Sequence, residues 1–191
     1  MTTTSRALPL AALGAAFAAC YALISHAPLR PPTEVAMPEG VSFIPEAAPL
    51  YLVMLPAGWF LPLLIRDEAR YRACIRATVL AFALTTSLWL LIPTVLLRPP
   101  APDGWLTAPW RLIACYDQPT NVFPCGHILA PTISAWFVGT ERTSWRPWLA
   151  LAWLAGAASI AMTWQHRPID ILAGTLIAGL AIAVCRRMQR S

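Results

Sequence analysis

The amino-acid sequence predicts an all-α fold: an integral membrane bundle of six transmembrane helices that forms a single domain over residues 1–191. The first observation is composition, since the chain is 58% hydrophobic and only 12% charged. Its mean hydropathy of +0.58 is far too high for an ordinary soluble domain. The second observation is that the apolar residues are grouped in runs long enough to cross a bilayer. The third is that no internal repeat or low-complexity tract marks a second domain.

Six apolar segments are expected to cross the membrane. Their ranges are 7–27, 47–65, 73–97, 124–140, 147–165 and 168–185. The first could instead be a signal peptide, because Phe17-Ala18-Ala19-Cys20 hints at a lipoprotein cleavage site. We expect a retained helix, since the apolar run continues past Cys20 and five further segments need a partner to form an even bundle.

Prolines and tryptophans indicate how these segments are connected. Residues 28–45 are rich in proline and include acidic residues, so they are expected to form an external loop and not a separate domain. Pro93 is expected to bend the third span near its end. The longest loop, 98–123, follows it, and Trp105 and Trp110 are expected to anchor this loop at the membrane interface.

The distribution of arginine predicts the orientation of the bundle. All 14 basic residues are arginine, and ten of them fall on one side of a six-span chain. These ten are Arg6, Arg66, Arg70, Arg72, Arg76, Arg142, Arg146, Arg186, Arg187 and Arg190, and the other four are Arg30, Arg98, Arg111 and Arg167. Because positive residues favour the cytoplasm, both termini are expected there, in the inner (plasma) membrane. The net charge of +5 is therefore not read as a nucleic-acid signal, and no nucleic-acid motif is present.

A polar loop at residues 116–127 carries the first candidate site. Pro124 suits the first position of a helix, which would leave the amides of Cys125, Gly126 and His127 free at the helix start. Free amides and the helix dipole favour a phosphate there, and His127 could exchange protons with it. The alternative is a membrane loop whose histidine is only a satisfied interfacial side chain.

The second candidate stretch is residues 159–170. Pro168 again indicates a helix start and places Asp170 in the first turn, where its carboxylate can reach back towards His166. A carboxylate that accepts from one imidazole nitrogen leaves the other nitrogen as a base or nucleophile. The alternative is a histidine and an aspartate that only solvate a short turn.

These two stretches are expected to lie on the same side of the membrane, where the loops around His127 and His166 face the periplasm or exterior. Charged groups at the edge of a membrane bundle are costly and usually functional. Arg98 opens onto the same side and could bind phosphate oxygens with two donors. The alternative for Arg98 is a side chain that extends to the interface.

The motif residues resemble the type 2 phosphatidic acid phosphatase superfamily of membrane enzymes. Its motifs are Lys, six residues, Arg-Pro; then Pro-Ser-Gly-His; then Ser-Arg, five residues, His, three residues, Asp. The matching residues are Arg98 and Pro99, then Pro124, Gly126 and His127, then Ser159, His166 and Asp170. The sequence around Asp117 and Asn121 is most similar to that of the branch that includes inositol phosphorylceramide synthases.

Three positions depart from these motifs. Leu91 replaces the lysine, Ile160 replaces an arginine and Cys125 replaces the serine. Each lost charged hydrogen bond would weaken a phosphate site by about 1.5 to 3 kcal/mol, and Arg111 and Arg167 could compensate. Cys125 is not expected to be the nucleophile, because Pro131 stands where a cysteine phosphatase has arginine. A disulfide between Cys115 and Cys125 is conceivable, but a small buried residue is the favoured interpretation of Cys125.

The resemblance implies a lipid-phosphate phosphatase or phosphotransferase with a phosphohistidine intermediate. His166, oriented by Asp170, would attack phosphorus and His127 would protonate the leaving alcohol. Arg98 and the amides of Cys125 and Gly126 would bind the phosphate oxygens. Neither a metal nor a cofactor is expected, and the partners would be a lipid phosphate substrate and membrane lipids. Hydrolase and transferase stay open, as do the oligomeric state and a non-catalytic lipid-binding or transport protein with the same fold.

Overall fold

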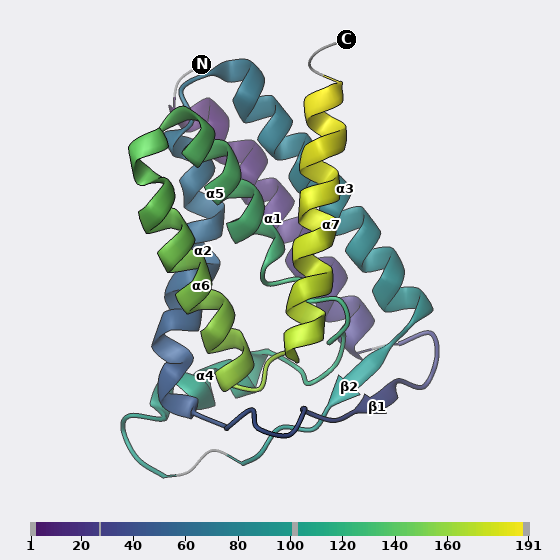
Figure 1. Cartoon of the computed structure of the whole chain (residues 1–191). Helices are drawn as coiled ribbons and strands as arrows, with labels where there is room; N and C mark the ends of the chain where they lie inside the picture. The colour runs from purple at the N-terminus through teal and green to yellow at the C-terminus, as the bar shows by residue number, and fades with distance from the viewer. Residues whose placement is uncertain (1–2, 27, 101–102, 189–191) are drawn as a thin grey trace.

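The computed structural model describes residues 3–26, 28–100 and 103–188, and most of them are helical. The helices are α1 (Thr3–His26), α2 (Ala48–Phe60), α3 (Glu68–Leu91), α4 (Ala108–Tyr116), α5 (Leu129–Glu141), α6 (Arg146–Met162) and α7 (Pro168–Arg187). Figure 1 shows α1, α2, α3, α5, α6 and α7 side by side, with both termini at one end of the bundle and α4, β1 (Thr33–Val35) and β2 (Thr94–Leu96) at the other end. Short 3₁₀ turns cover Pro45–Ala47, Leu61–Leu64 and Thr143–Trp145.

Among the described residues, four helical segments are long and apolar enough to cross a membrane. They are Arg6–His26, Pro45–Leu64, Glu68–Leu91 and Pro168–Arg187. α5 has 13 residues and α6 has 17, so both are shorter than a typical span. Leucines on α7, such as Leu172, Leu176 and Leu180, are exposed at the spacing of one helix face. Exposed leucines on long apolar helices are characteristic of a membrane protein.

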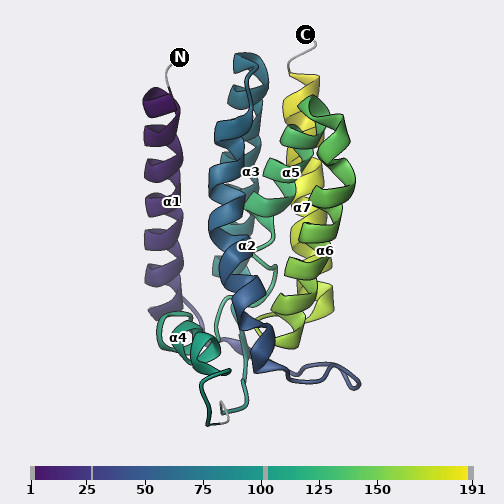
Figure 2. The ribbon, with the colours of Figure 1, turned by 90° about the vertical axis from the view of Figure 1, so that its left-hand side faces the viewer.

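Small residues allow the central helices to approach closely. Ala77 and Ala81 of α3 and Ala178 and Ala181 of α7 are completely buried in one cluster, which also contains Ile133 of α5. Helix interfaces in membranes are rich in small side chains because these allow close backbone packing. In the view turned by 90°, α1 stands at the edge of the bundle, away from α6 and α7 (Figure 2).

The end of the bundle opposite the termini carries the irregular structure. Strand β1 (Thr33–Val35) pairs in parallel with β2 (Thr94–Leu96), and Thr33 lies opposite Thr94 in the register. An isolated bridge joins Val95 to Thr120. The predicted external loop therefore contains a strand. The prediction that Pro93 bends the third span was wrong: α3 ends at Leu91 and β2 follows, because Pro93 cannot continue the helix.

The tryptophan predictions had mixed outcomes. Trp105 is 81% exposed, which suits an interfacial anchor. Trp110 is buried, and its indole nitrogen donates to the carbonyl oxygen of Thr163 at 3.1 Å, so it is a packing residue and not an anchor. The sequence could not distinguish the two residues because both follow prolines and small residues in the same loop.

The end that carries the termini holds most of the arginines. Arg6 pairs with Glu68 at 3.0 Å, and Arg70 pairs with Glu141 at 3.8 Å. Glu141 also accepts the backbone amide of Arg66 at 2.9 Å. These contacts join the ends of α1, α3 and α5. Arg190 of the predicted arginine side lies outside the described residues.

Candidate functional site

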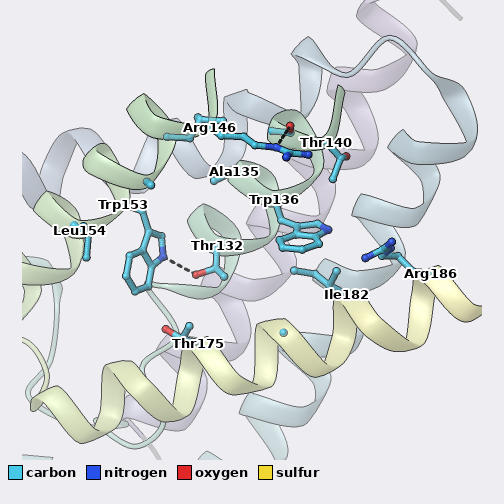
Figure 3. Close-up of a pocket in the computed structure, with 14 residues that line it drawn as sticks. Thr132, Ala135, Trp136, Thr140, Arg146, Trp153, Leu154, Thr175, Ile182 and Arg186 are labelled. Carbon is cyan, nitrogen blue, oxygen red and sulfur yellow. Dashed lines mark hydrogen bonds between the residues drawn. The ribbon is translucent and has the colours of Figure 1, made fainter. Parts of the chain in front are cut away.

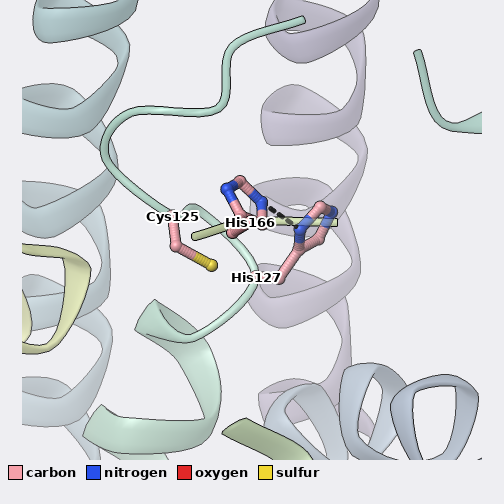
Figure 4. Close-up of side chains that lie close together, drawn as sticks. All are labelled: Cys125, His127 and His166. Atoms are coloured by element: carbon pink, nitrogen blue, oxygen red, sulfur yellow. Dashed lines mark hydrogen bonds between the residues drawn. The ribbon is translucent and has the colours of Figure 1, made fainter. Parts of the chain in front are cut away.

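Two histidines that are 39 residues apart in the sequence meet at the end of the bundle opposite the termini. His127 lies just before α5, and His166 lies between α6 and α7. Nδ1 of His127 is 2.9 Å from Nε2 of His166, and the two ring centroids are 5.1 Å apart (Figure 4). The structure therefore brings together the two predicted histidines, close enough to contact one phosphate group.

Backbone contacts fix both segments. Trp89 of α3 donates its indole N–H to the carbonyl oxygen of Pro124 at 3.0 Å, and Cys125 donates its amide to the carbonyl oxygen of Asp170 at 3.0 Å. Before His166, the amide of Gln165 donates to the carbonyl oxygen of Ile160 at 3.0 Å. The loop before α5 is thus attached to α3 and α7, and it is this attachment that places His127 beside His166.

Hydrogen bonding determines which nitrogens carry protons. Nδ1 of His166 is 2.6 Å from the carbonyl oxygen of Val122. A carbonyl can only accept, so Nδ1 of His166 carries the proton and Nε2 of the neutral ring has a free lone pair. The hydrogen bond to Nε2 then requires a proton on Nδ1 of His127. In this histidine pair, the Nδ1–H group of His127 therefore points at the lone pair on Nε2 of His166.

Burial keeps both rings neutral at pH 7. It lowers the pKa of His166 to about 3, and the neighbouring His127 acts in the same direction. Burial also lowers the pKa of His127, although Asp117 acts to raise it. His166 therefore has the protonation state of a nucleophile, and added negative charge beside His127 would favour its protonated form.

An ion pair stands next to the histidines. Arg98 donates to a carboxylate oxygen of Asp117 at 3.0 Å and to the Asp117 backbone carbonyl at 2.7 Å. Tyr21 of α1 donates its hydroxyl to the other carboxylate oxygen. Burial acts to raise the pKa of Asp117, but the neighbouring His127 and Arg98 and the Tyr21 hydrogen bond outweigh it and leave that pKa below its ordinary value. Asp117 is therefore an ionised neighbour of His127.

The predicted partner of Asp170 was wrong. Its carboxylate does reach back before α7, but it accepts the amide of Arg167 at 2.8 Å and the Arg167 guanidinium at 2.8 Å. His166 is oriented by the Val122 carbonyl instead. The adjacent arginine offers a charged donor as well as an amide, so the buried carboxylate pairs with it.

The predicted set of free amides at Pro124 was also wrong. α5 begins at Leu129, and the amide of Cys125 is used by the Asp170 carbonyl. The amides of Ile128 and His127 are turned towards the Cys125 sulfur. Of the three predicted amides, that of Gly126 has no hydrogen-bond partner within the described chain.

The other predicted site residues have structural partners. Arg111 donates to the Thr107 hydroxyl at 2.9 Å and to the Gly104 carbonyl at 2.8 Å. Asn121 is buried and donates its side-chain amide to the Ser25 hydroxyl at 2.8 Å. The Arg167 guanidinium is paired with the Asp170 carboxylate.

All five cysteines are free thiols, so the conceivable bridge between Cys115 and Cys125 is not formed. Cys115 is exposed, whereas Cys125 is completely buried and burial raises the pKa of its thiol. The Cys125 sulfur and the ring nitrogens of His127 and His166 all lie within 4.8 Å of one another. All three residues were predicted to belong to one site, but the approach of the Cys125 sulfur to the two rings depends on the fold.

Two cavities differ in their relation to the histidines. A cavity of about 300 Å³ reaches His127, and its walls include Tyr51, Leu55, Tyr116 and Asp117. A larger groove of about 870 Å³ lies between α5, α6 and α7, with Arg146 and Arg186 among its lining residues (Figure 3). The larger groove contains neither histidine, so we assign the site by its chemistry and not by volume.

Three contributors were missed at the sequence level. The Val122 carbonyl orients His166, and the rings of Tyr51 and Tyr21 lie 5.3 and 6.3 Å from that of His127. Backbone carbonyls carry no sequence signal, and both tyrosines sit in apolar runs where packing is the ordinary role.

The fold and the site together define a mostly helical membrane protein with a buried pair of histidines at one end of its helix bundle. Comparison with models of protein families and with curated proteins yields no match for this chain.

Proposed function

We propose that the protein is a lipid-phosphate phosphatase or phosphotransferase that works through a phosphohistidine on His166. The observation that carries this proposal is the 2.9 Å contact between Nε2 of His166 and Nδ1 of His127. A lone pair faced by an N–H donor is the arrangement that nucleophilic attack with protonation of a leaving group requires.

In the first step, the phosphate group of the substrate separates the two rings. Its negative charge, added to that of Asp117, favours a doubly protonated His127. Nε2 of His166 forms a bond to phosphorus while the bond from phosphorus to the lipid oxygen breaks. The Nδ1 proton of His127 passes to that oxygen, so the lipid alcohol leaves neutral and the His127 ring becomes neutral.

The phosphorylated His166 ring is positively charged while Nδ1 keeps its proton, and the Val122 carbonyl stabilises this charge by accepting that proton's hydrogen bond. In the second step, neutral His127 accepts a proton from water or from an alcohol, whose oxygen attacks phosphorus. The bond to Nε2 breaks, which leaves His166 neutral and His127 doubly protonated, as at the start of the first step. His127 gives its extra proton to solvent when the phosphate leaves, and both rings are then in their resting states. Water as acceptor gives a phosphatase and an alcohol gives a phosphotransferase.

Two further donors support a phosphate site. Nε of Arg98 is buried without a partner within the described chain, as is the case for the Gly126 amide. Gly126 directly precedes His127, and Arg98 is paired with Asp117, which lines the same cavity as His127. The cavity of about 300 Å³ beside His127 is lined mainly by apolar side chains, which suits a lipid more than a free sugar phosphate.

The proposal includes the finer topology. All six long helices would cross the membrane, with α5 and α6 extended by their flanking turns, and the histidine pair would face the periplasm or exterior of an inner (plasma) membrane. The ten-to-four distribution of arginine supports this orientation. A non-catalytic lipid-binding or transport protein is the alternative, and the substitutions at Leu91, Cys125 and Ile160 favour it.

The test is the His166→Asn variant. Its side-chain amide can still donate to the Val122 carbonyl, as Nδ1 does, but it has no nucleophilic nitrogen. Purified protein is assayed on phosphatidic acid, phosphatidylglycerophosphate, undecaprenyl diphosphate and phosphoinositides, and an acid-labile phosphoenzyme is trapped with a radiolabelled substrate. We expect the variant to lose turnover by about 10³-fold or more and to form no phosphoenzyme.

His26→Asn is the matched control, because His26 is exposed at the end of α1. It is expected to keep wild-type turnover. Phosphate release without an added alcohol would select the phosphatase, and transfer only with an alcohol would select the phosphotransferase. Turnover that survives in His166→Asn would remove the proposed nucleophile, and no turnover on any of these lipids in the wild type would favour the non-catalytic alternative.

A further inference from the structure

We propose that Cys125, His127 and His166 form a binding site for a divalent ion of the zinc class, and that the bound ion blocks phosphoryl transfer. The metal site rests on the geometry of the three side chains, whereas the blocking effect rests on the proposed function. The cluster combines one thiol with two imidazoles and contains no carboxylate. Thiolate and imidazole select zinc, cobalt or copper over magnesium and calcium.

The distances are close to those of a zinc site. Around a tetrahedral zinc ion, ligand atoms lie roughly 3.3 to 3.6 Å apart. The two ring nitrogens are 2.9 Å apart, and the Cys125 sulfur lies within 4.8 Å of both. The rings would separate by a few tenths of an ångström, and the sulfur would approach by about 1 Å. Figure 4 shows the sulfur end of Cys125 turned towards the rings.

The surroundings already hold the ligands as a metal site needs them. The ring nitrogen of His166 that does not face the cluster donates to the Val122 carbonyl at 2.6 Å, which is the usual outer contact of a metal-bound histidine. The amides of Ile128 and His127 are turned towards the Cys125 sulfur, where they could donate to a metal-bound thiolate. An ion would replace the proton shared by the two rings.

Three protein ligands leave one position of a tetrahedral ion open. The cavity of about 300 Å³ that reaches His127 provides space for a water molecule or a phosphate oxygen at this position. A divalent ion with one thiolate has a net charge of +1, which an anionic fourth ligand such as a phosphate oxygen would neutralise. Asp117, which lines the same cavity, is already paired with Arg98.

Occupation by the ion stops the proposed reaction for a simple reason. The ion uses the lone pair on Nε2 of His166 that would attack phosphorus, and it replaces the proton on Nδ1 of His127 that would reach the leaving oxygen. Cys125 raises the affinity for the inhibiting ion, because a serine at this position would leave two histidines as the only strong ligands.

Cobalt(II) is the probe for the site. Purified wild-type protein under reducing conditions is titrated with cobalt chloride, and the absorption spectrum is recorded. We expect a thiolate-to-cobalt charge-transfer band in the near ultraviolet and visible bands of tetrahedral cobalt. In Cys125→Ser the charge-transfer band should disappear and the cobalt affinity should fall by about 100-fold or more. Cys115→Ser, which removes an exposed thiol, is the matched control and should keep the wild-type spectrum.

A missing charge-transfer band in the wild type, or a band that survives in Cys125→Ser, would overturn the metal site. If Cys125→Ser does not fold, His166→Asn decides instead. This variant lacks one of the three ligands, so the visible bands of tetrahedral cobalt should disappear, and bands that persist would overturn the metal site.

Zinc inhibition tests the second half of the proposal. Zinc chloride is expected to stop lipid-phosphate turnover by the wild type, and a chelator should restore it. Turnover unaffected by zinc would overturn the blocking role. If the expected cobalt spectrum is seen but the protein has no turnover, the proposed function is wrong and the metal site stands. If the protein has turnover but the cobalt spectrum is absent, the metal site is wrong and the proposed function stands.

Discussion

At the scale of single residues, the hydrogen-bond partner of His166 determines how its ring is oriented and which nitrogen carries the proton. A backbone carbonyl, that of Val122, holds the ring, so the proton on Nδ1 does not depend on any side chain. Asp170 is completely buried and is used by Arg167, whose amide and guanidinium it accepts. We therefore assign Asp170 a structural role: it stabilises the first turn of α7 and does not bind His166.

This assignment predicts a stability effect for Asp170→Asn. Removing one member of a buried ion pair leaves the other without a partner, so we expect the free energy of unfolding to fall by about 3 to 5 kcal/mol. Arg167→Gln should cost a similar amount, and the double variant should cost less than the sum. Unfolding in detergent measures all three. A stable Asp170→Asn protein with no turnover would instead mean that Asp170 acts directly on the histidine.

The buried histidines also predict a pH dependence of stability. Folding lowers the pKa of His166 from 6.5 to about 3, so the unfolded chain binds the proton more readily. The stabilising contribution is complete above pH 6.5 and is lost as the pH falls towards 3. His127, Asp117 and Arg98 surround the ring, and the carboxylate of Asp117 is ionised throughout the upper part of this range.

We expect the unfolding temperature in detergent to fall between pH 7.5 and pH 5, and to fall less in His166→Asn, which has one buried titrating ring fewer. His26→Asn, at an exposed position, should follow the wild type. An equal fall in the wild type and in His166→Asn would contradict the neutral state assigned to His166.

At the scale of elements, α7 places the loop of Cys125 by close approach. A Cβ atom at Gly174 would lie 2.3 Å from the Cys125 carbonyl oxygen, which is a backbone atom that cannot move alone. A Cβ atom at Gly179, further along the same helix, would meet nothing within 4 Å. The first glycine is required for the position of the loop, and the second is not.

Gly174→Ala and Gly179→Ala therefore form a matched pair on one helix. We expect Gly174→Ala to lower the free energy of unfolding by about 1 to 3 kcal/mol and to reduce lipid-phosphate turnover, because the loop with His127 must shift. Gly179→Ala should match the wild type in both measurements. Equal behaviour of the two variants would show that the Cys125 loop does not depend on its contact with α7.

Elements were predictable from sequence where the cause is local. The apolar runs and Pro168 predicted α7 within two residues of its observed end, because length and a helix start are local properties. Pro124 carried the same signal, yet α5 begins at Leu129 because the Cys125 amide binds the Asp170 carbonyl, a partner far along the chain. The pairing of β1 with β2 was missed for the same reason, since each strand has three residues and its partner is distant.

The site divides in the same way. His127 and His166 were predicted because each stands beside a helix that the sequence indicates, and two loops at the same end of a bundle can meet. The contacts of Arg98 with Asp117, and of Asp170 with Arg167, depend on side-chain geometry that spacing does not determine. Cys125 could be recognised as a departure from the motif that the sequence resembles, but its approach to the rings could not.

At the scale of the whole molecule, most of the arginines and the histidine pair lie at opposite ends of the bundle. Arg6, Arg70 and Arg142 lie at the end that carries the termini, where α1 and α3 begin and α5 ends. The histidine pair and the ion pair of Arg98 with Asp117 lie at the other end. A membrane protein with this asymmetry is expected to keep its arginine-rich end in the cytoplasm, which would place the histidine pair on the outer side.

Single cysteines on the two ends test this orientation. Asp103→Cys and Ser144→Cys place exposed thiols near α4 and between α5 and α6, respectively, in a background where exposed Cys20 and Cys115 are alanine. A membrane-impermeant maleimide added to intact cells should label Asp103→Cys and not Ser144→Cys, and both should be labelled once the membrane is permeabilised. The background protein should stay unlabelled, because its remaining cysteines are buried. Labelling of Ser144→Cys alone in intact cells would place the histidines on the cytoplasmic side. The distribution of arginine would then have predicted the wrong orientation.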